Sequence, residues 1–292
     1  MLEIAQPDLK PALDVARSAS VEQASNGIRY GTYGDTQLSA TQIEQMVEAV
    51  PQTVAAALRS KMYYFVPLTV PDSSDDDNGR EVEPFDASKT MIALNVTTEL
   101  SDRAVCHRNI TVDATDYVFI STRLMQDRFA LAFEFYINAG HHFVDAVGVP
   151  ESFSRLAWSQ VEAGARGETS QDAWEQRAKA TGQPEPRAVD GAPASRSRPS
   201  RGSAARRSGE TPVPTAVVDE KARSEYFEAA FADAIAIYLL SLTVDFDYSE
   251  LREREYPLLA ASALAERLKH VAQLFPPNPG SEFSIRYRRR NG

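Results

Sequence analysis

The feature that most constrains the fold is a long apolar segment, residues 123–147, whose side chains repeat with helical spacing. The apolar residues occupy much of the helix circumference: Leu124, Phe129, Leu131, Ala132, Phe135, Tyr136, Ala139, Phe143 and Val144. A helix that is apolar on most sides must be covered on most sides. Gly148 and Pro150 follow it, as is typical of a helix end. The pattern therefore predicts a central buried helix around which the other elements pack.

Short segments before this helix are rich in β-branched and aromatic residues and predict strands: residues 61–70, 91–96, 110–112 and 117–122. Apolar residues with helical spacing predict further helices after it: residues 152–163, 171–180, 218–242 and 256–275. An earlier helix is expected to begin after Ser39 and to be interrupted at Pro51. We therefore expect an α+β fold, with a small sheet of three or four strands from residues 61–122 packed on the central helix and a mostly helical C-terminal half.

Composition divides the chain into unequal parts. Residues 182–214 contain many Pro, Gly, Ser and Ala and no aromatic residue, so they cannot bury enough apolar surface to offset their loss of conformational entropy. We interpret them as a disordered linker within a single domain made of residues 39–181 and 215–280. Residues 1–38 are weakly patterned and are expected to form a flexible N-terminal arm, and residues 281–292 a basic tail.

The charge of the chain bears on its partners. A formal net charge of −10 argues against nucleic acid as the main partner. A group of arginines in the linker could make weak contact with RNA or an acidic partner, although a solubilising role is the simpler interpretation: Arg196, Arg198, Arg201, Arg206 and Arg207. The longest apolar run, residues 229–244, contains Asp233 and is too short for a bilayer core of ~30 Å. With one cysteine and no visible signal peptide, we expect a cytoplasmic protein without a membrane partner.

Two motifs carry the chemistry of the chain. The central helix contains I-N-A-G-H-H-F-V-D over residues 137–145, and the helix after the linker contains E-A-A-F-A-D-A-I-A-I-Y-L over residues 228–239. Their order and spacing are similar to those of the zincin metallopeptidases, especially the branch that resembles the anthrax lethal factor catalytic domain. There the first helix reads roughly H-E-x-G-H-x-x-D and the later one E-x-F-A-E/D-A-F-x-x-Y. The resemblance covers residues 110–148 and 224–242, and it implies a zincin-like domain.

Taken residue by residue, the resemblance implies a zinc site that has lost most of its groups. Gly140 and His141 match the second half of the zinc motif. Ile137 stands at the first zinc ligand, Asn138 at the general base and Ala229 at the ligand Glu of the later helix. One imidazole does not replace the three protein ligands of a catalytic zinc, and loss of a general base costs about 10²–10⁴-fold in rate. The resemblance therefore implies a pseudoenzyme with no catalytic residue and no cofactor.

A different metal site is left open by the same helices. Glu134, His141 and Asp145 fall close to one stripe of the central helix. Glu228 or Asp233 could face them from the later helix. Such carboxylate–imidazole sets suit Zn, Mn or Fe. The simpler interpretation is a polar stripe inside a buried helix pair, satisfied by hydrogen bonds from nearby tyrosines: Tyr136, Tyr226 or Tyr238.

Three functions fit these residues. The one we favour is a zincin-like pseudoenzyme that acts as a binding or regulatory protein on a protein or peptide. The second is an active metal-dependent hydrolase that holds zinc or another divalent metal through a non-standard ligand set around His141. The third is a mostly helical scaffold in which the G-H-H motif is coincidental. The chain has neither a G-x-S-x-G elbow nor a G-x-x-x-x-G-K-[ST] phosphate loop, so these other enzyme classes have little support.

Overall fold

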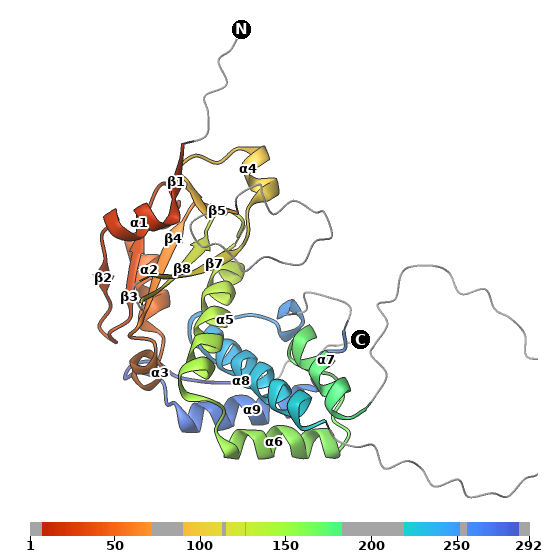
Figure 1. Cartoon of the computed structure of the whole chain (residues 1–292). Helices are drawn as coiled ribbons and strands as arrows, with labels where there is room; N and C mark the ends of the chain where they lie inside the picture. Colours follow the sequence, from red (N-terminus) through yellow and green to blue (C-terminus); the bar gives the residue numbers. More distant parts are fainter. Residues whose placement is uncertain are drawn as a thin grey trace, which may run out of the picture.

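In a computed structural model of the chain, residues 8–71, 90–112, 115–125, 127–182, 219–251 and 256–285 are described. The fold is α+β, as predicted: two small sheets lie at one end of the molecule and packed helices form the rest (Figure 1). Of the expected linker over residues 182–214, all but Gly182 lies outside the described residues.

The larger sheet has five strands in the order β2-β3-β4-β8-β7. Their bounds are Glu22–Gln23 (β2), Arg29–Thr32 (β3), Lys61–Val66 (β4), Thr115–Ser121 (β8) and His107–Val112 (β7). β3, β4 and β8 are parallel, and the two edge strands pair antiparallel. Residues 62–66 are all buried, which explains why β4 reads as a continuous apolar run, because a parallel strand is covered on both faces.

The smaller sheet explains why one strand predicted from the sequence, over residues 61–70, differs from the structure. It contains β1 (Leu9–Pro11), β6 (Met91–Ala93) and β5 (Leu68–Val70), in the order β1-β6-β5. The single strand expected over residues 61–70 is therefore β4 and β5, in different sheets. Pro67 lies between them, and because proline has no N–H to donate to a ladder, the chain can leave one sheet there and enter the other.

The prediction that residues 1–38 form a flexible arm is wrong for residues 8–38, the part of this segment that the structure describes. These residues form β1, α1 (Ala12–Ser18), β2 and β3, and Val15 and Ile28 are fully buried. β3 pairs with β4, about thirty positions later in the chain. A local pattern cannot reveal such pairing, because both the short strands and their burial depend on distant residues. The expected sheet of three or four strands from residues 61–122 was too small for the same reason.

Most of the described helices were expected, although the helices expected from residues 123 and 256 begin five residues later, at Arg128 and Ala261, and the short helix Thr98–Arg103 was not predicted. Their bounds are Ala40–Glu48 (α2), Gln52–Ala57 (α3), Thr98–Arg103 (α4), Arg128–Val147 (α5), Glu151–Glu162 (α6), Gln171–Ala180 (α7), Glu220–Thr243 (α8) and Ala261–Leu274 (α9), with a 3₁₀ turn at Tyr248–Leu251. Ser39 caps α2 with a capping box that includes Gln42, and Pro51 separates α2 from α3. Gly148, at φ 73°, ends α5. These three expectations are confirmed.

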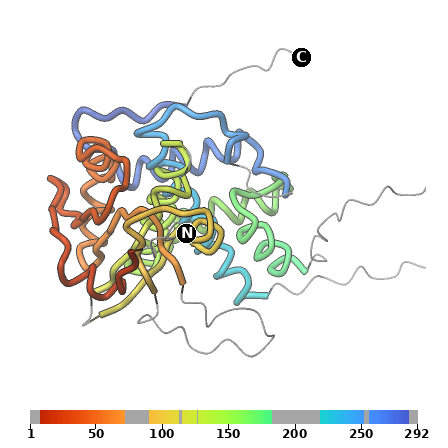
Figure 2. Tube along the Cα trace, turned by 90° about the horizontal axis from the view of Figure 1, so that it is seen from above, coloured from red at the N-terminus to blue at the C-terminus, as the bar shows by residue number. Residues whose placement is uncertain are grey.

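α5 is the central helix, as predicted. On one side it meets the larger sheet, where the Phe135 ring lies 5.2 Å from Tyr63 and 5.7 Å from Phe65. On its other side it packs along α8, and α6, α7 and α9 pack around α8 (Figures 1 and 2). α8 is buried on all sides from Ala230 to Leu240, so its apolar residues form the core of the helical half.

One further boundary differs from the sequence expectation. The basic tail expected from residue 281 begins later, because the Phe283 ring packs on Tyr238 at 5.3 Å and Ile285 packs on the core.

By length and composition alone, α8 could cross a membrane, contrary to the expectation from residues 229–244. A buried core helix meets the same criteria, and 67% of the most apolar window of α8 is buried inside the protein.

Candidate functional site

The two motif helices bring their marked positions to one cavity. Ile137 and His141 of α5, and Ala229 and Asp233 of α8, line a space of about 130 Å³ between the helices. Each pair is spaced i, i+4, which places both members on one face of the helix. The predicted contact between the motif helices, with His141 and Asp233 on the same side, is confirmed.

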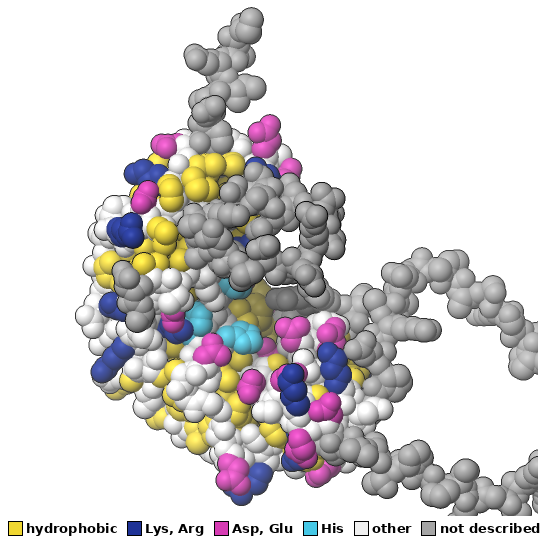
Figure 3. Space-filling model, in the orientation of Figure 1, with side chains coloured by type: hydrophobic (Ala, Val, Ile, Leu, Met, Phe, Trp, Pro, Cys, Tyr) yellow, Lys and Arg dark blue, Asp and Glu magenta, His cyan; other side chains and the backbone are white. Residues whose placement is uncertain are grey.

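A second space adjoins the first and opens outward. Its volume is about 250 Å³, and it shares His141, Asp172 and Ala229 with the inner space. We call the two spaces together the cleft. Five carboxylates line the outer part: Asp145, Asp172, Glu175, Glu225 and Glu228. They come from α5, α7 and α8, and Figure 3 shows acidic side chains beside the histidines on one face of the molecule.

The charge of the cleft lining is one-sided. Among the described residues that line the outer part there is no Lys or Arg, and His141 and Gln176 are its only side chains with nitrogen. Lys221 lies nearby, with its Nζ 3.6 Å from Glu225, but its side chain is 86% exposed. Water and salt screen such an exposed pair, so it offsets little of the negative charge.

The inner part of the cleft is largely apolar around one buried acid. Its apolar lining comes from five side chains: Phe133, Ile137, Ala229, Ile237 and Leu251. Asp233 is 5% exposed and accepts a hydrogen bond of 2.7 Å from Thr169 Oγ1. Burial raises the pKa of Asp233 to about 6, against the lowering effects of hydrogen bonds from Ser170 and Thr169 and of nearby His141. A positive charge that entered the cleft would favour the ionised form of Asp233.

A buried ion network fixes the loop that carries Thr169. Glu168 and Arg267 are both fully buried, and Arg267 Nη1 donates to Glu168 Oε2 at 2.8 Å. Tyr226 donates to Glu168 Oε1 at 2.9 Å, and Arg177 donates to the same oxygen at 3.1 Å. Because α7, α8 and α9 all hold Glu168, the next residue, Thr169, has a fixed position at the cleft. The sequence analysis did not identify this network.

The residues expected to form a metal site separate into two groups. His141, Asp145 and Glu228 share the outer part of the cleft, and Asp233 lies in the inner part. Glu134 does not join them. Its Oε1 lies 2.5 Å from His107 Nδ1 of β7, so it faces the sheet. Although Glu134 is on the same stripe as His141, seven residues correspond to ~10.5 Å along a helix. This distance is too long for the two side chains to coordinate the same metal ion.

Asn138, at the general-base position of the resemblance, does not line the cleft. It is 4% exposed, and its Nδ2 donates to the Glu134 carbonyl at 2.8 Å and to Glu134 Oε1 at 3.2 Å. Adjacent residues on a helix point about 100° apart. Ile137 can therefore face the cleft while Asn138 points away from it, toward Glu134.

His142, beside the motif histidine, belongs to the core. Its Nδ1 lies 3.2 Å from the Tyr63 hydroxyl and its Nε2 lies 3.3 Å from Asn109 Nδ2. Burial lowers the pKa of His142 to about 4; the charge of Lys61 acts in the same direction and that of Asp116 in the opposite one. His142 is therefore neutral at pH 7, whereas His141 is exposed at the cleft.

The tyrosines expected to satisfy a polar stripe do not do so. Tyr136 donates to the Met46 carbonyl at 2.9 Å, and Tyr238 donates to the Phe275 carbonyl at 2.7 Å. Tyr226 donates to Glu168. This expectation was wrong because all three hydroxyl groups point toward other elements, and Asp233 uses Thr169 instead.

The residues present do not fit a catalytic zinc centre of the zincin type. Ile137 and Ala229 have aliphatic side chains, and they line the cleft at the positions where ligands would stand. Within the described part of the chain, no group of three His, Cys, Asp or Glu side chains is arranged to hold a metal ion.

The cleft also contains acids that the sequence analysis missed. Asp172 and Glu175 on α7, and Glu225 on α8, line its outer part. A signal exists in the spacing, because Asp172 with Glu175 and Glu225 with Glu228 are i, i+3 pairs on one helix face. That spacing alone does not show that α7 packs beside α5 and α8.

Comparisons with known proteins gave no match: no family model matches the chain, and neither a curated protein nor a solved structure is similar to it. The resemblance to the zincins therefore rests on the two sequence motifs and their order alone, and it stays a prediction.

Proposed function

We propose that this protein is a zincin-like pseudoenzyme whose cleft binds a positively charged segment of a peptide or protein without a metal ion and without hydrolysis. The observation that carries the proposal is the lining of the cleft. Two of the three positions that would hold zinc ligands, Ile137 and Ala229, are aliphatic, and they lie between the outer carboxylates and the buried Asp233. Such a site is suited to recognition by charge and shape.

The chemistry of the lining favours an arginine or lysine side chain as the bound group. Both have an apolar stem and a cationic end, and stems of this kind pack on apolar surface while the charge stays near acids or water. The apolar inner walls, Ile137 and Leu251 among them, can pack against the stem. The carboxylates of the outer part, such as Glu225 and Glu228, can pair with the charge of that residue or of its neighbours in the peptide.

The groups needed for zincin-type hydrolysis are replaced. Asn138 cannot accept a proton as a carboxylate does, and its side chain is engaged with Glu134. Ile137 and Ala229 cannot coordinate a metal ion. Of the remaining groups, Asp233 can attract a cationic group by its charge, and an unprotonated ring nitrogen of His141 can accept a hydrogen bond from it, which are the roles that we propose for them.

Fluorescence anisotropy with two labelled peptides tests the proposal. One heptapeptide alternates Arg with Leu and the other alternates Glu with Leu, and both are measured with and without EDTA at physiological ionic strength. We expect saturable binding of the Arg peptide, unchanged by EDTA, and at least about tenfold weaker binding of the Glu peptide. Equal binding of both peptides would contradict the proposal. Mass spectrometry of the same samples without EDTA detects cleavage, and chelator-sensitive cleavage would favour the metal-dependent hydrolase.

A further inference from the structure

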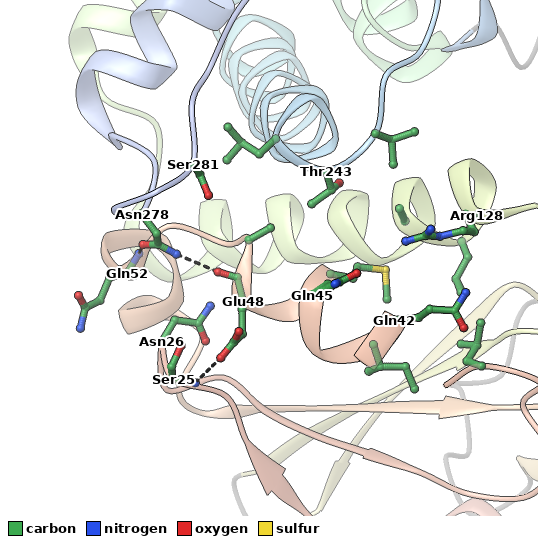
Figure 4. Close-up of a pocket in the computed structure, with 18 of the residues that line it drawn as sticks. Ser25, Asn26, Gln42, Gln45, Glu48, Gln52, Arg128, Thr243, Asn278 and Ser281 are labelled. Carbon is green, nitrogen blue, oxygen red and sulfur yellow. Dashed lines mark hydrogen bonds between the residues drawn. The ribbon is translucent and has the colours of Figure 1, made fainter. Parts of the chain in front are cut away.

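A separate cavity of about 590 Å³ lies toward the other end of α5 from the cleft. Its walls come from α2, the first turn of α5, the C-terminal end of α8 and residues 278–281 (Figure 4). Small-molecule sites commonly have volumes of about 300–1,000 Å³. The cavity is therefore large enough for a small organic ligand, and none of its lining residues belongs to the cleft.

The wall at one end is held by hydrogen bonds and is therefore already formed. Asn278 Nδ2 donates to the carbonyl oxygens of Glu48 and Val50 at 2.9 and 3.0 Å, and Asn278 Oδ1 accepts from Gln52 N at 2.9 Å. Asn26 Nδ2 donates to the Val50 carbonyl as well, at 3.0 Å. These two amides are thus engaged with the protein and do not bind a ligand.

At the opposite end, the polar groups that are available to a ligand are mainly donors. Arg128 makes no hydrogen bond or ion pair with another described residue, and nor does the Gln45 side chain. Gln42 uses its Oε1 to accept from Ser39, which leaves its Nε2 amide as a donor. Figure 4 shows Arg128 and Gln42 toward one end of the cavity, Gln45 near its middle, and Glu48 and Asn278 toward the other end.

Much of the remaining lining is apolar. It includes side chains from three helices and the residue after α8: Ile43, Met46, Leu131, Leu242 and Val244. A guanidinium matches the planar geometry of a carboxylate and binds it through two parallel hydrogen bonds. The Glu48 carboxylate at the far end would repel a second acidic group there.

From this arrangement we infer that the cavity binds a small organic monoanion with an apolar body, such as a monocarboxylate. Arg128 pairs with the acidic head group, Gln42 and Gln45 donate hydrogen bonds to it, and the apolar body packs on Met46 and Leu131. This site is independent of the peptide-binding cleft, so either proposal can fail without the other.

Nuclear magnetic resonance of protein labelled with ¹³C at the methionine methyl groups tests this inference, with decanoate as the probe. The Met46 methyl reports on the cavity, and Met62, which is buried on the far face of the larger sheet, serves as an internal control. We expect decanoate to shift the Met46 signal saturably and to leave the Met62 signal unchanged. We expect decyltrimethylammonium, with the same chain but a positive head group, and decanedioate, with two acidic groups, to bind at least about tenfold more weakly.

Two substitutions assign the binding to the arginine. Arg128→Gln is expected to weaken decanoate binding at least about tenfold, because a charge-assisted pair is lost. Arg155→Gln removes an arginine that is 72% exposed on α6 and lies outside the cavity, and it is expected to leave decanoate binding unchanged. Unchanged binding by Arg128→Gln, equal binding of decyltrimethylammonium, or a Met46 signal that does not move would overturn the inference.

Discussion

Gly140 of α5 lies against the backbone of Ala232 in α8, where a Cβ on the glycine would stand 2.6 Å from the Ala232 carbonyl oxygen. No real side chain tolerates so short a distance to backbone, so the absence of a side chain sets how closely the two helices approach. The cleft lies between His141 and Ala229, each close to this contact in sequence. The separation of its walls therefore depends on a single residue.

We expect Gly140→Ala to destabilise the protein by about 1–3 kcal/mol, since the methyl group forces two packed helices apart. Without this clash, alanine would stabilise the helix by up to about 1 kcal/mol relative to glycine. The sign of the change in the free energy of unfolding therefore shows whether the clash or the helix propensity dominates. Urea unfolding measures it. An unchanged or increased free energy of unfolding would show that α5 and α8 do not meet closely at Gly140.

Glu168→Gln is expected to cost about 3–5 kcal/mol, because it leaves the charge of Arg267 buried without its partner. Glu151→Gln is the matched control: Glu151 pairs with Arg155 at 3.5 Å, but both side chains are largely exposed, so little stability should be lost. Chemical denaturation of the two variants gives the comparison. Equal effects would mean that the buried network does not hold the loop before α7.

His142 should make the stability of the protein sensitive to acid. Its pKa in the folded state, about 4, lies below the ordinary value near 6.5, so the unfolded chain takes up a proton first as the pH falls. The contribution to stability is therefore present above pH ~6.5 and is lost progressively toward pH ~4, by up to about 3 kcal/mol.

His142→Gln keeps a polar side chain between Tyr63 and Asn109 but cannot be protonated in this range. Its free energy of unfolding, measured from pH 7.5 to pH 4, should fall less steeply than that of the wild type. Parallel curves for the two proteins would show that the imidazole does not carry this pH dependence.

The linker predicted over residues 182–214 can be tested by replacing residues 183–214 with a short Gly/Ser segment. The nearest described residues on its two sides are adjacent, since Asp219 N donates to the Ala180 carbonyl at 3.4 Å, so a short connection can join them. We expect the melting temperature to stay the same or rise slightly, because closing a loop of half the length costs about 0.6 kcal/mol less. A clear drop in melting temperature would mean that part of the replaced segment packs on the domain.

The elements most accurately predicted were those whose signal is local. α7 was expected at residues 171–180, where it is observed, and the end of α5 followed from Gly148 and Pro150. The convergence of Ile137, His141, Ala229 and Asp233 could be predicted too, because helix geometry fixes which residues share a face once two helices are taken to pack together.

What the sequence did not reveal depends on contacts between distant segments. β3 is recognisable as a strand only beside β4, and the carboxylates of α7 belong to the cleft only because α7 packs on α8. The pairing of Glu168 with Arg267 joins residues about a hundred positions apart, and no spacing rule connects them. The burial of His142 rather than His141 likewise follows from which face of α5 meets the sheet.

The central claim, recognition of a cationic segment by the carboxylates of the cleft, is tested most directly with two charge-matched variants and the labelled Arg/Leu peptide in EDTA. The first variant changes three acids that line the cleft: Asp145→Asn, Glu225→Gln and Glu228→Gln. The second changes three exposed acids elsewhere: Glu44→Gln, Glu99→Gln and Glu151→Gln. Both variants lower the net negative charge equally, so any difference between them reflects the cleft itself.

At about 0.5 kcal/mol for each exposed pair, loss of the three cleft carboxylates should weaken peptide binding roughly tenfold. The second variant should bind the peptide nearly as well as the wild type. Equal weakening in the two variants would attribute binding to the overall charge of the protein and would contradict the claim that the cleft is the binding site.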